Sequence, residues 1–163
     1  MARSRKDPRH RAREAALQIL YHWDIGRTEI TTAANTFFTL QWPNADPPDD
    51  ELRAFASTLA RGTVQRLEEI DELIAGTAER WRPERMAVLD RLILRMAIGE
   101  MIRDPGTPPA VIINEALELA RTFSTEESVK FINGMLDAIR KKIDVKADTK
   151  GTINTEDAGD TKD

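Results

Sequence analysis

The sequence contains no cysteine among its 163 residues. This absence excludes disulfide bonds, zinc–thiolate sites and thiol nucleophiles, and it fits a reducing compartment. No apolar run approaches the ~18 residues that a membrane-spanning helix needs. The charged N-terminus is not followed by the apolar stretch of a secretory signal. We therefore expect a cytoplasmic protein that does not enter the membrane.

Patterns typical of catalysis or cofactor binding are also missing. His10 and His22 are the only two histidines, and neither has a partner at metal-ligand spacing. The eight glycines form neither a G-x-G-x-x-G fingerprint nor a Walker loop, and no nucleophile elbow occurs. Glu115 and Glu118 lack an E-x-x-H motif, so we interpret them as solvated side chains of one helix face. The sequence predicts neither an enzyme nor a bound metal or other cofactor.

Charge is present in abundance but is distributed unevenly. The whole chain has a formal charge of −4, whereas residues 1–14 hold six basic and two acidic side chains and are therefore +4. A basic arm on an acidic body points to a polyanionic partner, although a simply solvated terminus gives the same pattern. The basic residues of this segment are Arg3, Arg5, Lys6, Arg9, Arg11 and Arg13.

Apolar residues recur at helical spacing through most of the chain, and no segment alternates with the period of a strand. Gly26 is expected to end the first helix in a left-handed conformation. Residues 86–102 are apolar around most of the circumference, which is typical of a central helix. The predicted helices cover about residues 8–26, 29–42, 49–81 with a break near 68–71, 83–102, 109–123 and 124–143.

The two ends of the chain lack this periodicity. Residues 1–8 are predicted to be a flexible basic arm. Residues 144–163 contain six acids, three lysines and almost nothing apolar, so we expect a disordered acidic tail. The segment 9–143 is predicted to form a single all-helical domain.

Three blocks of sequence carry a family resemblance: RHRAREAALQILY (residues 9–21), LDRLILRMAIGEM (89–101) and VIINEALELARTFSTEESVKFINGMLDAIR (111–140). Together they resemble the NusB family of bacterial transcription antitermination factors. The third block is the most specific, because its order of residues is hard to obtain from helix periodicity alone. The resemblance extends over about residues 9–143, and the predicted second and third helices match poorly.

The resemblance implies an all-α fold of about seven helices in two packed sub-bundles, about 9–80 and 81–143. It implies binding of boxA-type single-stranded RNA in ribosomal RNA leader transcripts together with NusE, a protein of the small ribosomal subunit. The pair would join the RNA polymerase antitermination complex. An alternative is a helical protein-binding adaptor module without direct RNA binding, and a homodimer is a further alternative for the free protein.

Binding of single-stranded RNA needs cations along the phosphates and flat side chains on which bases stack. Arg9, Arg11 and Arg13 occupy the arginine-rich positions of the family, so we expect RNA contacts there. Tyr21 matches the family tyrosine, and stacking on a base and core packing are both open for it. The cations that extend this charge before the helix are Arg3, Arg5 and Lys6.

The last predicted helix offers a second RNA-binding candidate. Lys130 and Phe131 lie off its main buried stripe and form a reasonable stacking platform. Glu127 matches the family pattern near RNA, although it can also be the glutamate of a capping box that begins at Ser124. Gly134 is mid-helix, where we expect it to permit close helix–helix approach.

A partner surface is predicted on the polar side of the central helix. Glu84, Asp90 and Arg91 are candidates to face NusE, which is expected to be basic. Pairing of these charges within the chain is an equally weighted alternative.

Overall fold

The computed structural model describes residues 8–43, 46–78 and 85–157, with side chains described as far as residue 146. Within these ranges the chain forms seven α-helices and one π-helix, and it forms no strand. The predicted all-α fold of about seven helices is confirmed. The elements are α1 (Pro8–Gly26), α2 (Ile30–Thr36), η2 (Phe37–Gln41), α3 (Asp50–Gln65), α4 (Leu67–Thr77), α5 (Val88–Arg103), α6 (Pro109–Phe123) and α7 (Glu126–Asp157).

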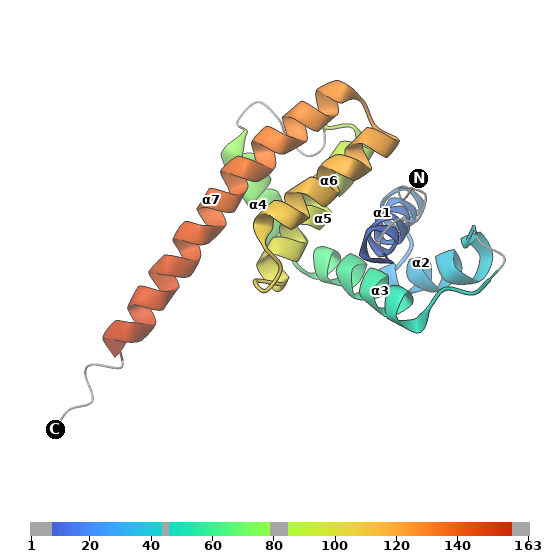
Figure 1. Cartoon of the computed structure of the whole chain (residues 1–163), viewed down its shortest axis with the longest axis horizontal. Coiled ribbons are helices and arrows are strands. Elements are labelled where there is room, and N and C mark those ends of the chain that lie inside the picture. The colour runs from blue at the N-terminus through green and yellow to red at the C-terminus, as the bar shows by residue number, and fades with distance from the viewer. Residues whose placement is uncertain (1–7, 44–45, 79–84, 158–163) are drawn as a thin grey trace.

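The first bundle is formed by α1, α2 with η2, and α3 (Figure 1). Helix α1 packs on α3, and its small and aliphatic residues are buried, as are Phe37 and Phe38 of η2. Such a stripe of buried residues at helical spacing supplies most of the stability of an amphipathic helix. The largest fully buried side chains of this bundle are Leu17, Ile19, Leu20, Phe37 and Leu59.

The second bundle is organised around α5, which packs against α4, α6 and α7. Every residue from Leu92 to Met101 is buried, which confirms the prediction of a central helix. Helices α3 and α1 also pack on α5, so this helix joins the two bundles. Gly99 lies at the crossing with α3, where an added Cβ would be only 3.1 Å from the Oγ1 of Thr63.

Helix α4 belongs with the second bundle rather than the first. Arg95 of α5 donates two hydrogen bonds to the Asp71 carboxylate, at 2.9 and 2.8 Å. At the C-terminal end of α4 the Nζ of Lys142 donates to the carbonyl oxygen of Gly76 at 2.8 Å, a favourable place for a cation. The bundles therefore divide near Arg66, and not near residue 80 as the sequence predicts.

Several helix ends differ from their predicted positions. Gly26 ends α1, but the left-handed residue is Arg27, with φ of 50°. The predicted break near 68–71 falls earlier, at Arg66. Helix α5 begins at Val88, later than predicted. Ala87, the residue before it, has a non-helical backbone with ψ of 140° and is the N-cap.

The last helix is longer than the periodicity predicts. Helix α7 continues past Ile143 to Asp157, into the segment expected to be disordered. No proline interrupts this stretch, and propagation of an existing helix costs far less than nucleation of a new one. Gly134 of α7 is exposed, and an added Cβ would meet nothing within 4 Å. The expected close helix approach at Gly134 is therefore wrong.

Candidate nucleic-acid interface

The arginines at the start of α1 divide between the surface and the interior. Arg9 and Arg11 are exposed, as the sequence predicts for RNA contacts. The guanidinium carbon of Arg9 lies 4.4 Å from the ring centroid of Phe55 on α3. This contact holds Arg9 on the outer side of the α1–α3 pair while leaving it accessible.

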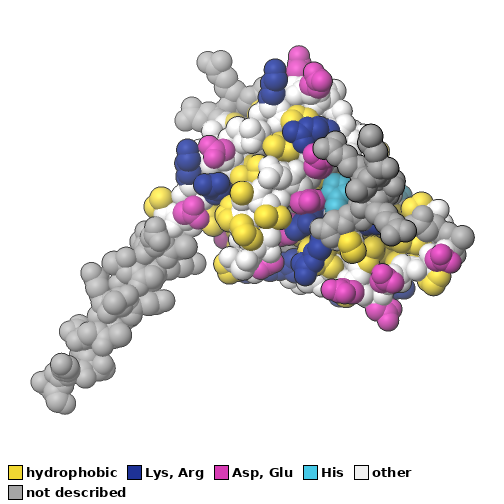
Figure 2. All heavy atoms as spheres, in the orientation of Figure 1, with side chains coloured by type: hydrophobic (Ala, Val, Ile, Leu, Met, Phe, Trp, Pro, Cys, Tyr) yellow, Lys and Arg dark blue, Asp and Glu magenta, His cyan; other side chains and the backbone are white. Residues whose placement is uncertain are grey.

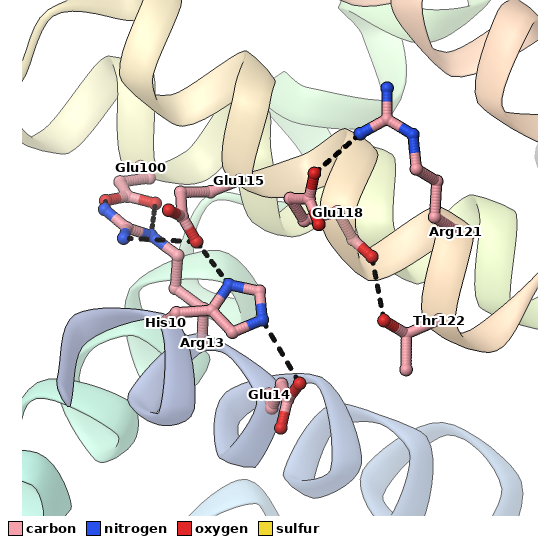
Figure 3. A network of polar contacts seen from close by, with 8 residues as sticks. All are labelled: His10, Arg13, Glu14, Glu100, Glu115, Glu118, Arg121 and Thr122. Carbon is pink, nitrogen blue, oxygen red and sulfur yellow. Dashed lines mark hydrogen bonds and ion pairs between the residues drawn. The ribbon is translucent and has the colours of Figure 1, made fainter. Parts of the chain in front are cut away.

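Arg13 has a different environment, because it is only 4% exposed. Its Nε and Nη2 donate to the carboxylate of Glu100 on α5 at 3.1 and 2.5 Å, and Glu100 is only 2% exposed (Figure 3). Removal of either partner would leave the other charge buried, which is strongly unfavourable. Arg13 therefore fastens α1 to α5, and its burial argues against the predicted RNA contact.

His10 extends the same polar network from α1 to α6. Its Nδ1 lies 2.5 Å from the Oε2 of Glu115, and its Nε2 lies 3.2 Å from the Oε1 of Glu14 (Figure 3). The predicted solvated face of α6 is thus wrong for Glu115. It is right for Glu118, which is exposed and pairs with the neighbouring Arg121 at 2.8 Å.

Glu100 was not among the sequence candidates, although the sequence contains a signal for it. It is the one carboxylate in the buried stretch of α5 from Leu92 to Met101. A buried charge needs a partner. The sequence therefore calls for a buried cation, but only the fold shows that this cation is Arg13, whereas Arg95 of the same stretch pairs with Asp71.

At the other end of α1, Tyr21 is 41% exposed. Of the two roles left open for it, an accessible aromatic ring therefore describes it better than core packing. One turn later Asp24 accepts a hydrogen bond from Arg91 of α5 at 2.7 Å. This ion pair fixes the end of α1 against the start of α5.

Asp90, the neighbour of Arg91, joins α5 to the start of α7. Its carboxylate accepts hydrogen bonds from the hydroxyl groups of Ser124 and Ser128, both at 2.7 Å. Asp90 and Arg91 are therefore both engaged within the chain, which favours the intramolecular alternative over contact with a partner. Glu84, the third predicted partner residue, lies outside the described residues.

The start of α7 differs in detail from the predicted capping box. The Oγ1 of Thr125 accepts a hydrogen bond from the backbone N–H of Ser128 at 3.1 Å, so Thr125 is the N-cap. Glu127 is exposed and is not needed to explain this helix end. It stays a predicted RNA-proximal residue.

The α7 candidates follow the residue of α7 that binds the start of α5. Lys130 is exposed, and Phe131 is half-buried against the core. On α7, Phe131 lies one turn after Ser128, and on α1, Asp24 lies one turn after Tyr21. Ser128 bonds to Asp90 and Asp24 bonds to Arg91, which are consecutive residues of α5. Tyr21 and Phe131 therefore each lie about one turn of their own helix from a residue that bonds to the start of α5. Arg3, Arg5 and Lys6 lie outside the described residues.

Together these features define a class of protein. It is an all-α protein of two bundles, with surface arginines and aromatic rings that suit a polyanion. Among the described residues, no group of three or more His, Asp or Glu side chains is placed to hold a metal ion. None of the helices in the described ranges is long and apolar enough to span a membrane.

The chain belongs to the NusB family, whose model matches residues 10–141. The transcription antitermination protein NusB of Solibacter usitatus (strain Ellin6076) is 49% identical over 135 residues, which cover 83% of this chain and 90% of that protein. T. maritima NusB has the same fold, with a TM-score of 0.74 and 33% identity over 84% of this chain and 93% of that one. The resemblance seen in the sequence is thereby confirmed.

A solved complex of NusB and NusE with double-stranded RNA contains a further similar chain. It matches with a TM-score of 0.73 and 24% identity, and the match covers 83% of this chain and 97% of that chain. At 24% identity this likeness supports the shared fold alone.

Proposed function

We propose that this protein is a transcription antitermination factor that binds boxA-type single-stranded RNA of ribosomal RNA leader transcripts together with NusE. Its relatives at 40–49% identity carry the name of transcription antitermination protein NusB. The observation that carries the proposal is the outward placement of Arg9 and Arg11 on a helix that Arg13 fastens to the core. The ion pair of Arg13 with Glu100 holds α1 in place, so that Arg9 and Arg11 have fixed positions at the surface.

The roles of the site residues follow from their placement. Arg9 and Arg11 would neutralise phosphates, and the predicted cations of residues 1–7 would extend this track. Tyr21 and Phe131 would supply faces for unpaired bases at the other end of α1, with Lys130 beside them. Glu127 would lie near the RNA. The protein would act by binding and not by catalysis, as a platform within the RNA polymerase antitermination complex.

The test is the affinity for a labelled boxA-type RNA, measured with and without NusE at two salt concentrations. We expect NusE to raise the affinity, and the affinity to fall as salt rises, because phosphate contacts release counterions. Absence of any gain from NusE would contradict the proposal. Retention of NusE after RNase treatment, combined with no RNA binding at low salt, would instead support the protein-binding adaptor.

A further inference from the structure

The π-helix η2 carries a compact aromatic cluster beside the candidate interface. Phe37, Phe38 and Trp42 pack against one another, with ring centroids 5.2 to 6.1 Å apart. Both phenylalanines are buried, whereas Trp42 is half-buried. The indole N–H of Trp42 donates to the carbonyl oxygen of Asp46 at 2.9 Å. The Trp42 ring is therefore fixed in place while part of it faces solvent.

Two surface arginines from different helices lie over this cluster. The guanidinium carbon of Arg11 on α1 is 5.8 Å from the Trp42 centroid, and that of Arg53 on α3 is 5.3 Å from the Phe38 centroid. Trp42 and Phe38 are themselves 5.7 Å apart. Arg11, Trp42, Phe38 and Arg53 thus form one continuous row across three elements, which we call the aromatic row.

The aromatic row begins at Arg11, a residue already proposed to contact RNA. Arg11 and Arg9 are the two exposed arginines of α1, and Arg53 is exposed at the other end of the row. A guanidinium held over a ring loses less conformational freedom when it binds, and its flat face suits a nucleobase as well as an aromatic ring. The geometry therefore offers unpaired bases a pre-ordered stacking surface that is continuous with the cations of α1.

The charge around Arg53 indicates how it would act. Asp49, Asp50 and Glu51 are all exposed at the start of α3, and acidic side chains gather over that end of the molecule (Figure 2). They complement the helix dipole, but they also weaken the local attraction for phosphate. A contribution of Arg53 to RNA affinity must therefore come from stacking more than from net charge.

We propose that the RNA-binding surface extends from α1 across η2 to α3, where Arg53 and Trp42 stack on unpaired bases that flank the boxA-type element. The proposal rests on the RNA-binding function proposed above. It adds a second arm to the interface, next to Arg11 in the first half of α1, whereas Tyr21 lies near the end of that helix.

The test compares Arg53→Gln and Arg53→Lys with Arg61→Gln, which removes an exposed arginine from the same helix. Two RNA probes are used, the boxA-type element alone and the element with flanking single-stranded nucleotides. For the longer RNA we expect Arg53→Gln to lower the affinity about tenfold, the scale of one lost stacking contact. Arg53→Lys should lose a similar factor, because lysine keeps the charge but not the plane. Arg61→Gln should change it by less than about twofold.

For the element alone, all three variants should bind as the parent protein does. The proposal is overturned if Arg53→Gln and Arg61→Gln behave alike on the longer RNA while Arg11→Gln weakens binding. It is also overturned if Arg53→Lys binds normally, or if Arg53→Gln weakens NusE binding in the absence of RNA and leaves RNA affinity unchanged. If Arg9→Gln and Arg11→Gln are also without effect, the failure lies in the proposed function itself.

Discussion

Arg11 and Arg13 are two residues apart on α1, yet they belong to different regions of the molecule. Arg13 lies at the junction of the two bundles, buried in an ion pair with Glu100, whereas Arg11 lies on the outer face beside Trp42. Two residues turn an α-helix by about 200°. The comparison shows that the residue type of a family arginine does not by itself define a ligand contact, because the packing around each position decides its role. Arg9 lies one turn before Arg13 and over the same Phe55 ring, yet it is exposed because it is at the start of the helix.

The largest expected effect comes from breaking the junction. Arg13→Ala should lower the free energy of unfolding by about 3–5 kcal/mol, because Glu100 loses its buried partner. Arg11→Ala should lower it by less than about 1 kcal/mol, the value of an exposed cation–π contact. Denaturant unfolding followed by circular dichroism measures both. Equal effects of the two substitutions would remove the distinction between the regions.

Substitutions of two glycines should have smaller effects on stability than Arg13→Ala, and the two effects should have opposite signs. Gly99→Ala places a Cβ 3.1 Å from Thr63 at the α3–α5 crossing and should destabilise the fold by about 1–3 kcal/mol. Gly134→Ala points its Cβ into open space on α7 and should stabilise the fold by about 0.5–1 kcal/mol. Thermal melting of both variants provides the measurement. Destabilisation by Gly134→Ala would contradict the open placement of this residue.

The smallest expected effect is that of Glu29, in a comparison of two helix caps. The backbone N–H groups of Thr31 and Thr32 donate to the Glu29 carboxylate at the start of α2, and these bonds lower the pKa of Glu29 below its ordinary value of 4.5. A lowered pKa stabilises the folded state at neutral pH, and this contribution is lost as the pH falls through the folded-state pKa. Thr125, the cap of α7, does not titrate in this range.

Glu29→Gln should therefore destabilise the protein slightly at pH 7, and the difference from the parent should shrink as the pH falls below about 4.5. Thr125→Ala should cost about 1 kcal/mol with little pH dependence of its own. Melting temperatures across this pH range measure both differences. A pH-independent effect of Glu29→Gln would contradict the assigned cap.

Most of the fold follows from the sequence because apolar periodicity and prolines mark the helices. Helix α6 begins at Pro109 as predicted, and the nearly all-apolar α5 lies at the centre. The end of α1 at Gly26 agrees with the prediction, but the left-handed residue is Arg27, because a left-handed cap follows the last helical residue. Helix ends depend on a few local hydrogen bonds and are less well determined than helix centres.

The candidate site follows from the sequence only in part. Arg13 lies at helical spacing from Ala16, Leu17 and Leu20, all of which are buried, so its burial could have been inferred. Its partner Glu100 is 87 residues away, and helix packing alone brings the two together. The aromatic row depends on the π-helix, which shifts the register of Phe38 and Trp42 relative to an α-helix, and no propensity of these residues predicts that shift.

The most direct test of the central claim is the salt dependence of RNA affinity for the double variant Arg9→Gln, Arg11→Gln. The matched control is Arg61→Gln, Arg66→Gln, which removes the same charge from α3 and its end. We predict a weaker affinity and a slope of log affinity against log salt that is shallower by about 1–2 units, whereas the control keeps the parent slope. A parent-like slope in the Arg9, Arg11 variant would contradict the placement of the RNA interface at the exposed arginines near the start of α1.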